Sequence, residues 1–119
     1  MPSPAHIRST IAAITAPPEE LRAVAAYHTA LSDPTRLRLL QRLAGAPATV
    51  TELTEHVDLS QPLVSWHLGK LREVGLVTAR RHGRETVHTI VPEAFVQFAD
   101  RQARALNLAD QTPVRQAIS

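Results

Sequence analysis

Residues 49–77 read TVTELTEHVDLSQPLVSWHLGKLREVGLV and contain two helix starts separated by a tight turn. Thr49 and Glu52 have the spacing of a capping box, in which each side chain binds the backbone N–H of the other residue at the start of a helix. Ser60 is expected to cap the next helix, which should end at Gly75. The sequence therefore predicts two consecutive helices joined by a short turn, the arrangement of a helix-turn-helix unit.

Two further helices are predicted upstream of this unit. Pro18 with the two acidic residues after it opens a helix that should end near Ser32, because proline and acids both favour a first helical turn. Asp33 followed by Pro34 is a strong start for the second helix. Its buried face is expected to consist of Leu37, Leu40, Leu43 and Ala44.

Downstream, the spacing of apolar residues changes from helical to alternating. The alternation from Leu76 to Ile90 predicts a β-hairpin with a basic turn at residues 81–84. Pro92 then opens a last helix, whose apolar stripe includes Phe95, Phe98 and Leu106. The predicted fold class is mainly α with a small β-hairpin wing, which is a winged helix-turn-helix.

The charge of the chain is distributed unevenly. The net charge is only +2, but residues 60–91 hold five basic side chains against two acidic ones, for a local sum of +3. A basic segment in an otherwise neutral small domain is typical of a nucleic-acid-binding face, although a solvated surface is the alternative.

The helix after Ser60 has one apolar face and one outer face. Val64, Leu68 and Leu71 point one way at helical spacing, and His67 belongs to this inner stripe as a structural residue. On the outer side, Gln61 can bind the edge of an adenine through two hydrogen bonds, and Ser65 is short enough to let the helix approach DNA. The predicted DNA-binding residues are Ser60, Gln61, Pro62, Ser65, Trp66 and Arg72 on this helix, with Arg80, Arg81, His82 and Arg84 on the hairpin.

Several ordered motifs together resemble one protein family. They are ALSDPTRLRLL at 30–40, Glu52-Leu53, SQPLVSWHL at 60–68 and LREVGLV at 71–77. Over roughly residues 21–98 the chain resembles the ArsR/SmtB family of bacterial transcriptional regulators. The resemblance implies a homodimer that binds an inverted-repeat operator in double-stranded DNA, usually as a repressor that a metal ion or another signal releases. Trp66 departs from the family pattern, in which this position more often carries His or Arg, and helical phase places its side chain on the exposed side.

The expected organisation is one domain with short terminal extensions. Residues 1–18 form an N-terminal arm or short helix, 19–108 the DNA-binding and dimerisation domain, and 109–119 a flexible tail. No apolar run is long enough to cross a membrane, so we expect a cytoplasmic protein that does not bind membranes. The dimer is expected to form through an apolar stripe that one small domain cannot fully cover, consisting of Leu21, Val24, His28, Phe95, Phe98 and Leu106.

A metal sensor site is not expected. Arsenic-sensing members of the family carry Glu-Leu-Cys-x-Cys where this chain has Glu52-Leu53-Thr54-Glu55-His56, and the chain has no cysteine at all, which excludes soft-metal sensing through that site. Zinc- and nickel-sensing members place His and carboxylate ligands on the last helix, which has no His here. The weak candidates are Glu52, His56 and His6, too few ligands for a site. No cofactor is expected, and the effector is open between a small ligand, a separate sensing protein or none.

Other function classes fit the sequence less well than a DNA-binding regulator. An enzyme is disfavoured, because Ser65, Trp66 and His67 are consecutive on a helix and their side chains diverge by about 100° per residue, so they form no catalytic pair. A metal-responsive zinc or nickel derepressor and a dimerisation adaptor that has lost DNA binding remain alternatives. The basic hairpin argues against the adaptor.

Overall fold

The structure is a computed structural model that describes residues 18–108. The chain forms five helices and a three-stranded antiparallel sheet in this range: α2 (Pro18–Leu31), α3 (Pro34–Gly45), β1 (Ala48–Thr49), α4 (Val50–Val57), α5 (Gln61–Glu73), β2 (Val77–His82), β3 (Glu85–Ile90) and α6 (Pro92–Ala105). The expected arm and tail lie outside the described residues, apart from Pro18. None of the described helices is long and apolar enough to span a membrane.

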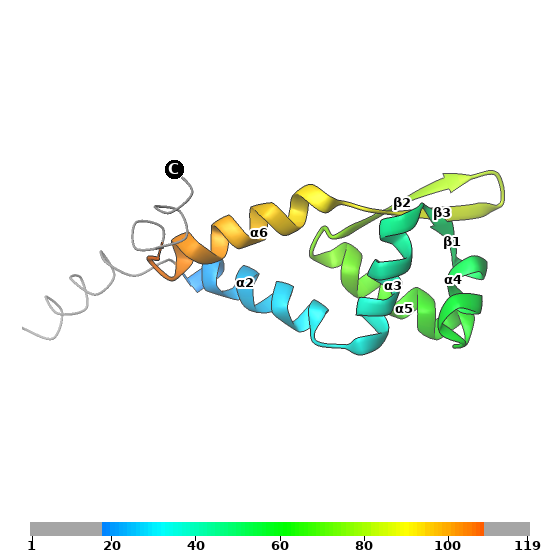
Figure 1. The fold of residues 1–119 in the computed structure, drawn as a ribbon, viewed down its shortest axis with the longest axis horizontal. Helices are drawn as coiled ribbons and strands as arrows, with labels where there is room; N and C mark the ends of the chain where they lie inside the picture. The colour runs from blue at the N-terminus through cyan, green and yellow to red at the C-terminus, as the bar shows by residue number, and fades with distance from the viewer. Residues whose placement is uncertain (1–17, 109–119) are drawn as a thin grey trace, which may run out of the picture.

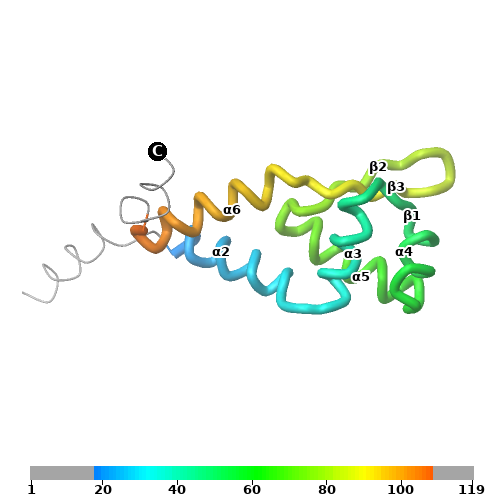
Figure 2. Tube along the Cα trace, viewed as in Figure 1, coloured from blue at the N-terminus to red at the C-terminus, as the bar shows by residue number. Residues whose placement is uncertain are grey.

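The elements are arranged in two parts (Figure 1). Helices α2 and α6 come from the two ends of the described chain and pack side by side. Helices α3, α4 and α5 and the sheet form the other part, from which the β2–β3 hairpin projects (Figure 2). This arrangement confirms the predicted winged helix-turn-helix.

The starts of α3 and α4 follow from local sequence. The Asp33 carboxylate accepts hydrogen bonds from the backbone N–H groups of Thr35, at 2.8 Å, and Arg36, at 3.2 Å. At α4 the Thr49 hydroxyl accepts from the N–H of Glu52, while the Glu52 carboxylate accepts from the N–H of Thr49. Both caps satisfy donors that have no partner inside the helix, as the sequence predicted.

The ends of α5 differ in how they are held. Ser60 occupies the cap position, but its hydroxyl makes no capping hydrogen bond, so the expected side-chain cap is wrong. At the other end Gly75 takes a left-handed conformation with φ 78°, and the N–H of Leu76 reaches the carbonyl of Leu71. This closing motif favours glycine, because a side chain is strained at positive φ.

The sheet places the hairpin beside the helix-turn-helix unit. Strand β3 is central and pairs with both β1 and β2, with Ala48 opposite His88 and Ala79 opposite the same residue. The hairpin turn is tighter than predicted, because β2 continues to His82 and β3 begins at Glu85. Gly83, with φ 66°, supplies the left-handed conformation that a two-residue turn requires.

The core lies where α3, α4, α5 and the sheet meet. Its fully buried side chains include Leu39, Leu43, Leu53, Val64, Leu68, Leu71, Leu76 and Val77. The predicted buried face of α3 is partly wrong, since Leu37 is 48% exposed and Ala44 is also exposed, whereas Leu39 and Arg36 are buried. The apolar face is therefore rotated toward Leu39, and it includes a charged residue.

Candidate nucleic-acid interface

Helix α5 has the two faces that its sequence predicts. Val64, His67, Leu68 and Leu71 are buried in the core. Gln61, Pro62, Ser65 and Trp66 are exposed, and Trp66 retains 54% of its accessible surface, which confirms the predicted orientation of this side chain. The N-terminal half of α5 therefore offers an unobstructed outer face.

A groove separates this end of α5 from the hairpin. It has a volume of about 340 Å³ and is lined by Gln61 and Ser65 of α5, by Arg81, Arg84, Glu85 and Thr86 of the hairpin, and by Thr49, Val50 and Thr51 at the start of α4. Two predicted base-reading residues and two predicted wing residues thus share one concave surface. Arg80 and His82 alternate with Arg81 along β2, so their side chains point to the other face of the strand.

Arg72 lies against the sheet at the far end of α5. Its Nη1 is 3.3 Å from Nε2 of His88, a buried residue at the centre of β3. Burial, together with the nearby positive charge of Arg72, lowers the pKa of His88. A neutral imidazole can accept the hydrogen bond, so His88 holds an exposed arginine of α5 against the wing.

A second group of side chains lies on the α2 side of α5. The Trp66 ring has Nζ of Lys70 at 5.4 Å and Cζ of Arg36 at 5.9 Å from its centroid, both within the range of cation–π contacts. The exposed side of α5 is therefore divided. Gln61 and Ser65 face the wing, whereas Trp66 and Lys70 face α2 and α3.

Arg36 is a structural residue that the apolar pattern did not reveal. It is buried, and its guanidinium donates from Nε to the carbonyl of Ala30 at 2.7 Å and from Nη2 to that of Thr29 at 3.2 Å. Its Nη1 is 3.0 Å from Nδ1 of His67. This one side chain joins the end of α2, the start of α3 and the inner face of α5, and its place among Leu39, Leu40 and Leu43 on the helical stripe was the only sign of it in the sequence.

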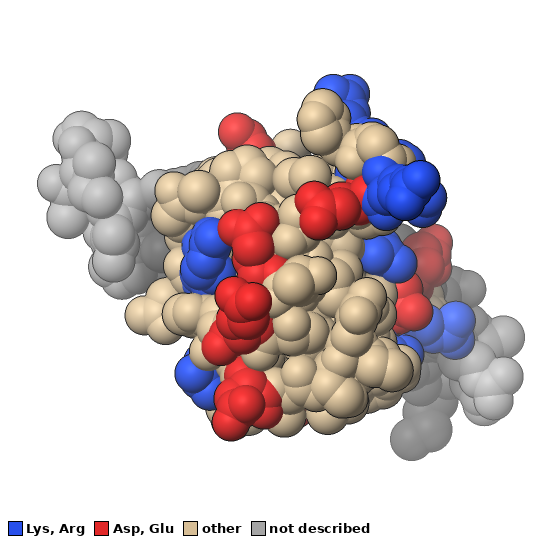
Figure 3. All heavy atoms as spheres, turned by 90° about the vertical axis from the view of Figure 1, so that its right-hand side faces the viewer, with Lys and Arg blue, Asp and Glu red and all other residues tan. Residues whose placement is uncertain are grey.

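The charges at the helix-turn-helix end are unevenly distributed. Figure 3 shows basic residues at the upper right of this surface, a band of acidic residues down its middle and further basic residues along its left edge. Helix α4, at this end of the molecule, carries exposed Glu55, and exposed Asp58 follows directly after its last residue. A polyanion is therefore attracted to the hairpin and repelled from α4.

The fold and sequence match known transcriptional regulators. A family model described as a helix-turn-helix domain matches residues 31–80. A probable mercury resistance operon repressor of Streptomyces lividans is 39% identical over 90 residues, which cover 76% of this chain and 71% of that protein. The crystal structure of an ArsR family transcriptional regulator is 30% identical and covers 83% of this chain and 99% of its own, with a TM-score of 0.63.

This chain belongs to the ArsR/SmtB family. The family consists of DNA-binding transcriptional regulators, which confirms the resemblance and the function class predicted from the sequence. The solution structure of a homodimeric winged helix-turn-helix DNA-binding domain from Mycobacterium bovis, a possible ArsR-family regulator, is also similar. It is 30% identical, with a TM-score of 0.61 over 71% of this chain and 80% of that one.

The residues predicted to form an ArsR-type dimer interface lie on α2 and α6, but they are not equally available. Val24 and Phe98 are buried within the protomer, Phe95 is half-buried, and Leu21 and Leu106 are 44% and 51% exposed. The exposed His28 contacts Gln102 of α6 through its Nε2. Part of the predicted stripe thus packs between α2 and α6 within one protomer, whereas Leu21 and Leu106 remain exposed and can contact a second protomer.

The weak metal-ligand candidates are placed separately. Glu52 is bound to Thr49 in the capping box and lies 3.4 Å from Arg42, and His56 is exposed on the same helix. His6 lies outside the described residues. Among residues 18–108, no group of three His, Cys, Asp or Glu side chains could hold a metal ion.

Proposed function

We propose that the protein is a cytoplasmic repressor that binds as a homodimer to an inverted-repeat operator. In this proposal α5 enters the major groove and the β2–β3 hairpin lies along the neighbouring backbone and minor groove. A two-fold dimer presents two such units to the two halves of the operator.

The groove between α5 and the hairpin carries this proposal. It brings Gln61 and Ser65, whose side chains suit base edges, beside Arg81 and Arg84, whose guanidinium groups suit phosphates. If the basic hairpin were only a solvated surface, no helix with polar side chains suited to base edges would be expected beside it. The exposed acidic side chains of Glu52 and Glu55 on α4 support the same orientation, because they disfavour a path for the DNA backbone over that helix.

The proposed roles follow from the position of each side chain. Gln61 binds an adenine edge, Ser65 allows close approach, and the exposed Trp66 contacts thymine methyl groups or a sugar. The phosphate contacts are assigned to Ser60 at the start of α5, to Arg72 at its end, and to Arg80, Arg81, His82 and Arg84 on the hairpin, with Pro62 packing at the groove edge.

The test is to select bound fragments of the source genome with purified protein and to measure affinity for the selected site and for random DNA. Gln61→Ala should lower the ratio of the two affinities by roughly 5- to 100-fold, because a base-edge contact carries about 1–3 kcal/mol of discrimination. The matched control is Gln41→Ala, an exposed glutamine of α3, which should leave the ratio unchanged. An unchanged ratio for Gln61→Ala contradicts the assignment of α5, and a protein that selects no DNA is the dimerisation adaptor instead.

A further inference from the structure

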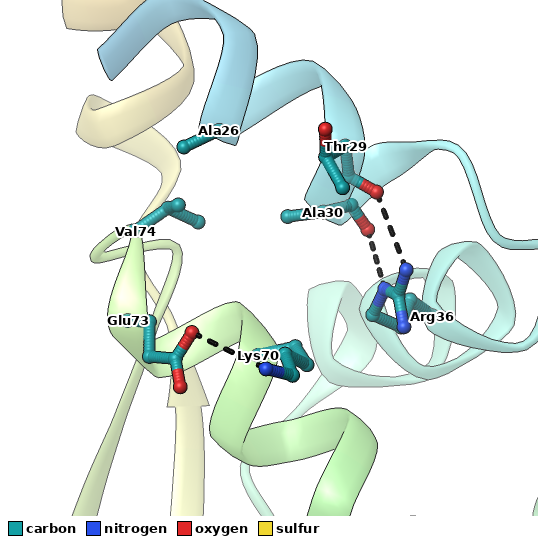
Figure 4. Close-up of a pocket in the computed structure, with 7 residues that line it drawn as sticks. All are labelled: Ala26, Thr29, Ala30, Arg36, Lys70, Glu73 and Val74. Atoms are coloured by element: carbon teal, nitrogen blue, oxygen red, sulfur yellow. Dashed lines mark hydrogen bonds and ion pairs between the residues drawn. The ribbon is translucent and has the colours of Figure 1, made fainter. Parts of the chain in front are cut away.

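A second pocket lies between α2, the start of α3 and the C-terminal half of α5 (Figure 4). Its volume is about 220 Å³, and it does not share a lining residue with the groove beside the hairpin. Apolar groups of Ala26, Ala30 and Val74 form one part of its wall, and the remaining lining residues are Thr29, Arg36, Lys70 and Glu73.

Arg36 brings to this pocket a buried positive charge that forms no salt bridge with any residue in the range 18–108. It is 7% exposed, and its three hydrogen-bond contacts are with two backbone carbonyls and one imidazole, none of which is a carboxylate. The carboxylate of Asp33 interacts electrostatically with Arg36, but its hydrogen bonds go to backbone N–H groups at the start of α3 and not to the guanidinium. Buried charges in proteins are normally paired, and a guanidinium has five N–H donors, so two remain for an anion.

Lys70 supplies a second cation whose present partner is easily exchanged. Its Nζ lies 3.8 Å from the carboxylate of Glu73, and the side chains of Lys70 and Glu73 are 41% and 67% exposed to solvent. Such an ion pair contributes little, because water competes with it. A carboxylate that also reaches Arg36 gains a buried, charge-assisted contact that Glu73 does not make.

We propose that this pocket binds a small organic monocarboxylate and serves as the effector site of the regulator. The carboxylate lies between Lys70 and Arg36, and a short apolar body packs against Ala26, Ala30 and Val74. Inorganic phosphate fits less well, because it leaves these three apolar side chains uncovered. The effector role rests on the proposed function, whereas binding itself does not.

The position of the pocket explains how its occupant can affect DNA binding. It touches α2 and the C-terminal half of α5, and Arg36 binds both helices, so a ligand on Arg36 acts on the contact between them. A ligand shifts the protein only if it binds one arrangement of α2 and α5 more tightly than another. Ala26 and Ala30 lie on roughly the opposite face of α2 from Leu21 and Val24, so a partner seated on that stripe leaves the pocket open.

Binding is measured on the DNA-free protein through Trp66, the only tryptophan in the chain, which lies beside Lys70 and Arg36. Acetate, isobutyrate and benzoate are titrated, with benzamide as the neutral isostere of benzoate. We expect saturable changes in fluorescence with affinity rising along the series to about the millimolar range for benzoate, and at least about tenfold weaker binding of benzamide. The absence of a saturable change with all three acids, or equal binding of benzamide, overturns the site.

Four variants separate pocket binding from general charge effects. Lys70→Met should weaken benzoate binding at least about fivefold, and Ala26→Leu, which fills the pocket, should abolish it. Glu73→Gln should strengthen binding about two- to fivefold, because it removes the competing carboxylate. Arg38→Met removes one positive charge, as Lys70→Met does, but Arg38 lies on the side of α3 that faces away from the pocket residue Arg36. This variant should therefore leave the benzoate affinity within about twofold. Equal losses in Lys70→Met and Arg38→Met, with circular dichroism showing both folded, contradict the proposal.

The effector role is tested with the selected operator DNA. Saturating benzoate should change the DNA dissociation constant at least about threefold for the wild-type protein and should have no effect on Ala26→Leu. Benzoate that binds without changing DNA affinity overturns the effector role but leaves the site. A protein that binds no DNA overturns the proposed function, while the fluorescence titration still decides whether the pocket takes a carboxylate.

Discussion

Arg80 and Arg84 are the residues at which phosphate binding can be measured most directly, because both are exposed on the hairpin and neither forms an ion pair with any residue in the range 18–108. Each phosphate contact releases counter-ions from DNA. We therefore expect Arg80→Ala and Arg84→Ala to weaken binding to all DNA, and each to reduce the slope of log affinity against log salt by roughly one unit. Fluorescence anisotropy over a series of salt concentrations measures both quantities.

The control for this experiment is Arg38→Ala, which removes an exposed arginine of α3 that donates to the carbonyl of His56. Its salt slope should match the wild-type value. If Arg80→Ala or Arg84→Ala also keeps the full slope, the residue makes no phosphate contact. If only Arg84→Ala reduces the slope of log affinity against log salt, the contact with the DNA backbone lies on the groove side of the hairpin, because Arg84 lines the groove and Arg80 does not.

His88 should make the stability of the fold depend on pH. Burial and the positive charge of Arg72 lower its pKa in the folded state, so the unfolded chain takes up a proton at this residue first. The contribution of neutral His88 to the free energy of unfolding is fully present above the pKa of about 6.5 that a histidine has in the unfolded chain. It is lost as the pH falls toward the lower pKa of His88 in the folded protein. Urea midpoints measured from about pH 7.5 to pH 5.5 should fall less steeply for His88→Leu than for the wild-type protein. Parallel falls in the two proteins contradict this role.

The residues that sequence reasoning placed correctly and those it missed differ in one respect. Exposure of Trp66 and burial of His67 follow from helical phase alone, since both lie on a helix with a clear apolar stripe. Arg36 and His88 are also on buried faces of their elements, but a search for apolar periodicity does not count polar residues as core. Their roles depend on partners distant in the chain, the carbonyls of α2 and the guanidinium of Arg72.

At the scale of elements, the N-cap of α3 is the clearest local determinant of the fold. Burial raises the pKa of Asp33, but the hydrogen bonds from two backbone N–H groups, together with electrostatic interactions with His67 and Arg36, outweigh this effect and lower the pKa. Asp33→Ala should lower the free energy of unfolding at neutral pH by about 1 kcal/mol, the usual value of such a cap. Urea denaturation measures the loss, and Asp33→Asn is the control that should keep most of the stability.

Asp33→Ala has a further consequence at low pH. Because the folded pKa of Asp33 is lowered, its contribution is present above the unfolded pKa of about 3.9 and is lost as the pH falls below it. The difference between wild-type protein and Asp33→Ala should therefore shrink in acid. A difference that stays constant shows that the cap acts without the charge of the carboxylate.

The helices could be predicted and the smallest strand could not, for a physical reason. Capping residues and apolar spacing act within a few positions of the chain, so the starts of α3, α4 and α6 are visible in the sequence. Strand β1 has two residues and exists because Ala48 and Thr49 pair with β3, about forty residues later. The groove beside α5 is equally non-local, since it requires the hairpin to fold back toward the recognition helix.

At the scale of the whole molecule, α2 and α6 cover each other incompletely. Tyr27 stacks on Phe98 with a centroid distance of 4.4 Å, and Val24 is buried beside them. Leu21 and Leu106 remain about half exposed, although each is large and apolar. The helix pair thus keeps an apolar surface that a second copy of the chain can cover, which is the basis for assigning the dimer interface to it.

We expect light scattering at micromolar concentration to give twice the chain mass of 13.0 kDa, and Leu21→Glu combined with Leu106→Glu to reduce it to that of one chain. Leu37→Glu is the matched control, because Leu37 is 48% exposed on α3, outside the helix pair, and should leave the dimer intact. The monomeric variant retains one α5 and one hairpin, so it should bind a single half-site. Its preference for the base that Gln61 contacts should be the same as in the wild-type protein. It should lose the requirement for two half-sites about 34–36 Å apart, since only a two-fold dimer fixes that spacing. A wild-type mass of 13.0 kDa, or a glutamate double variant that remains dimeric, contradicts the assignment of the interface to α2 and α6.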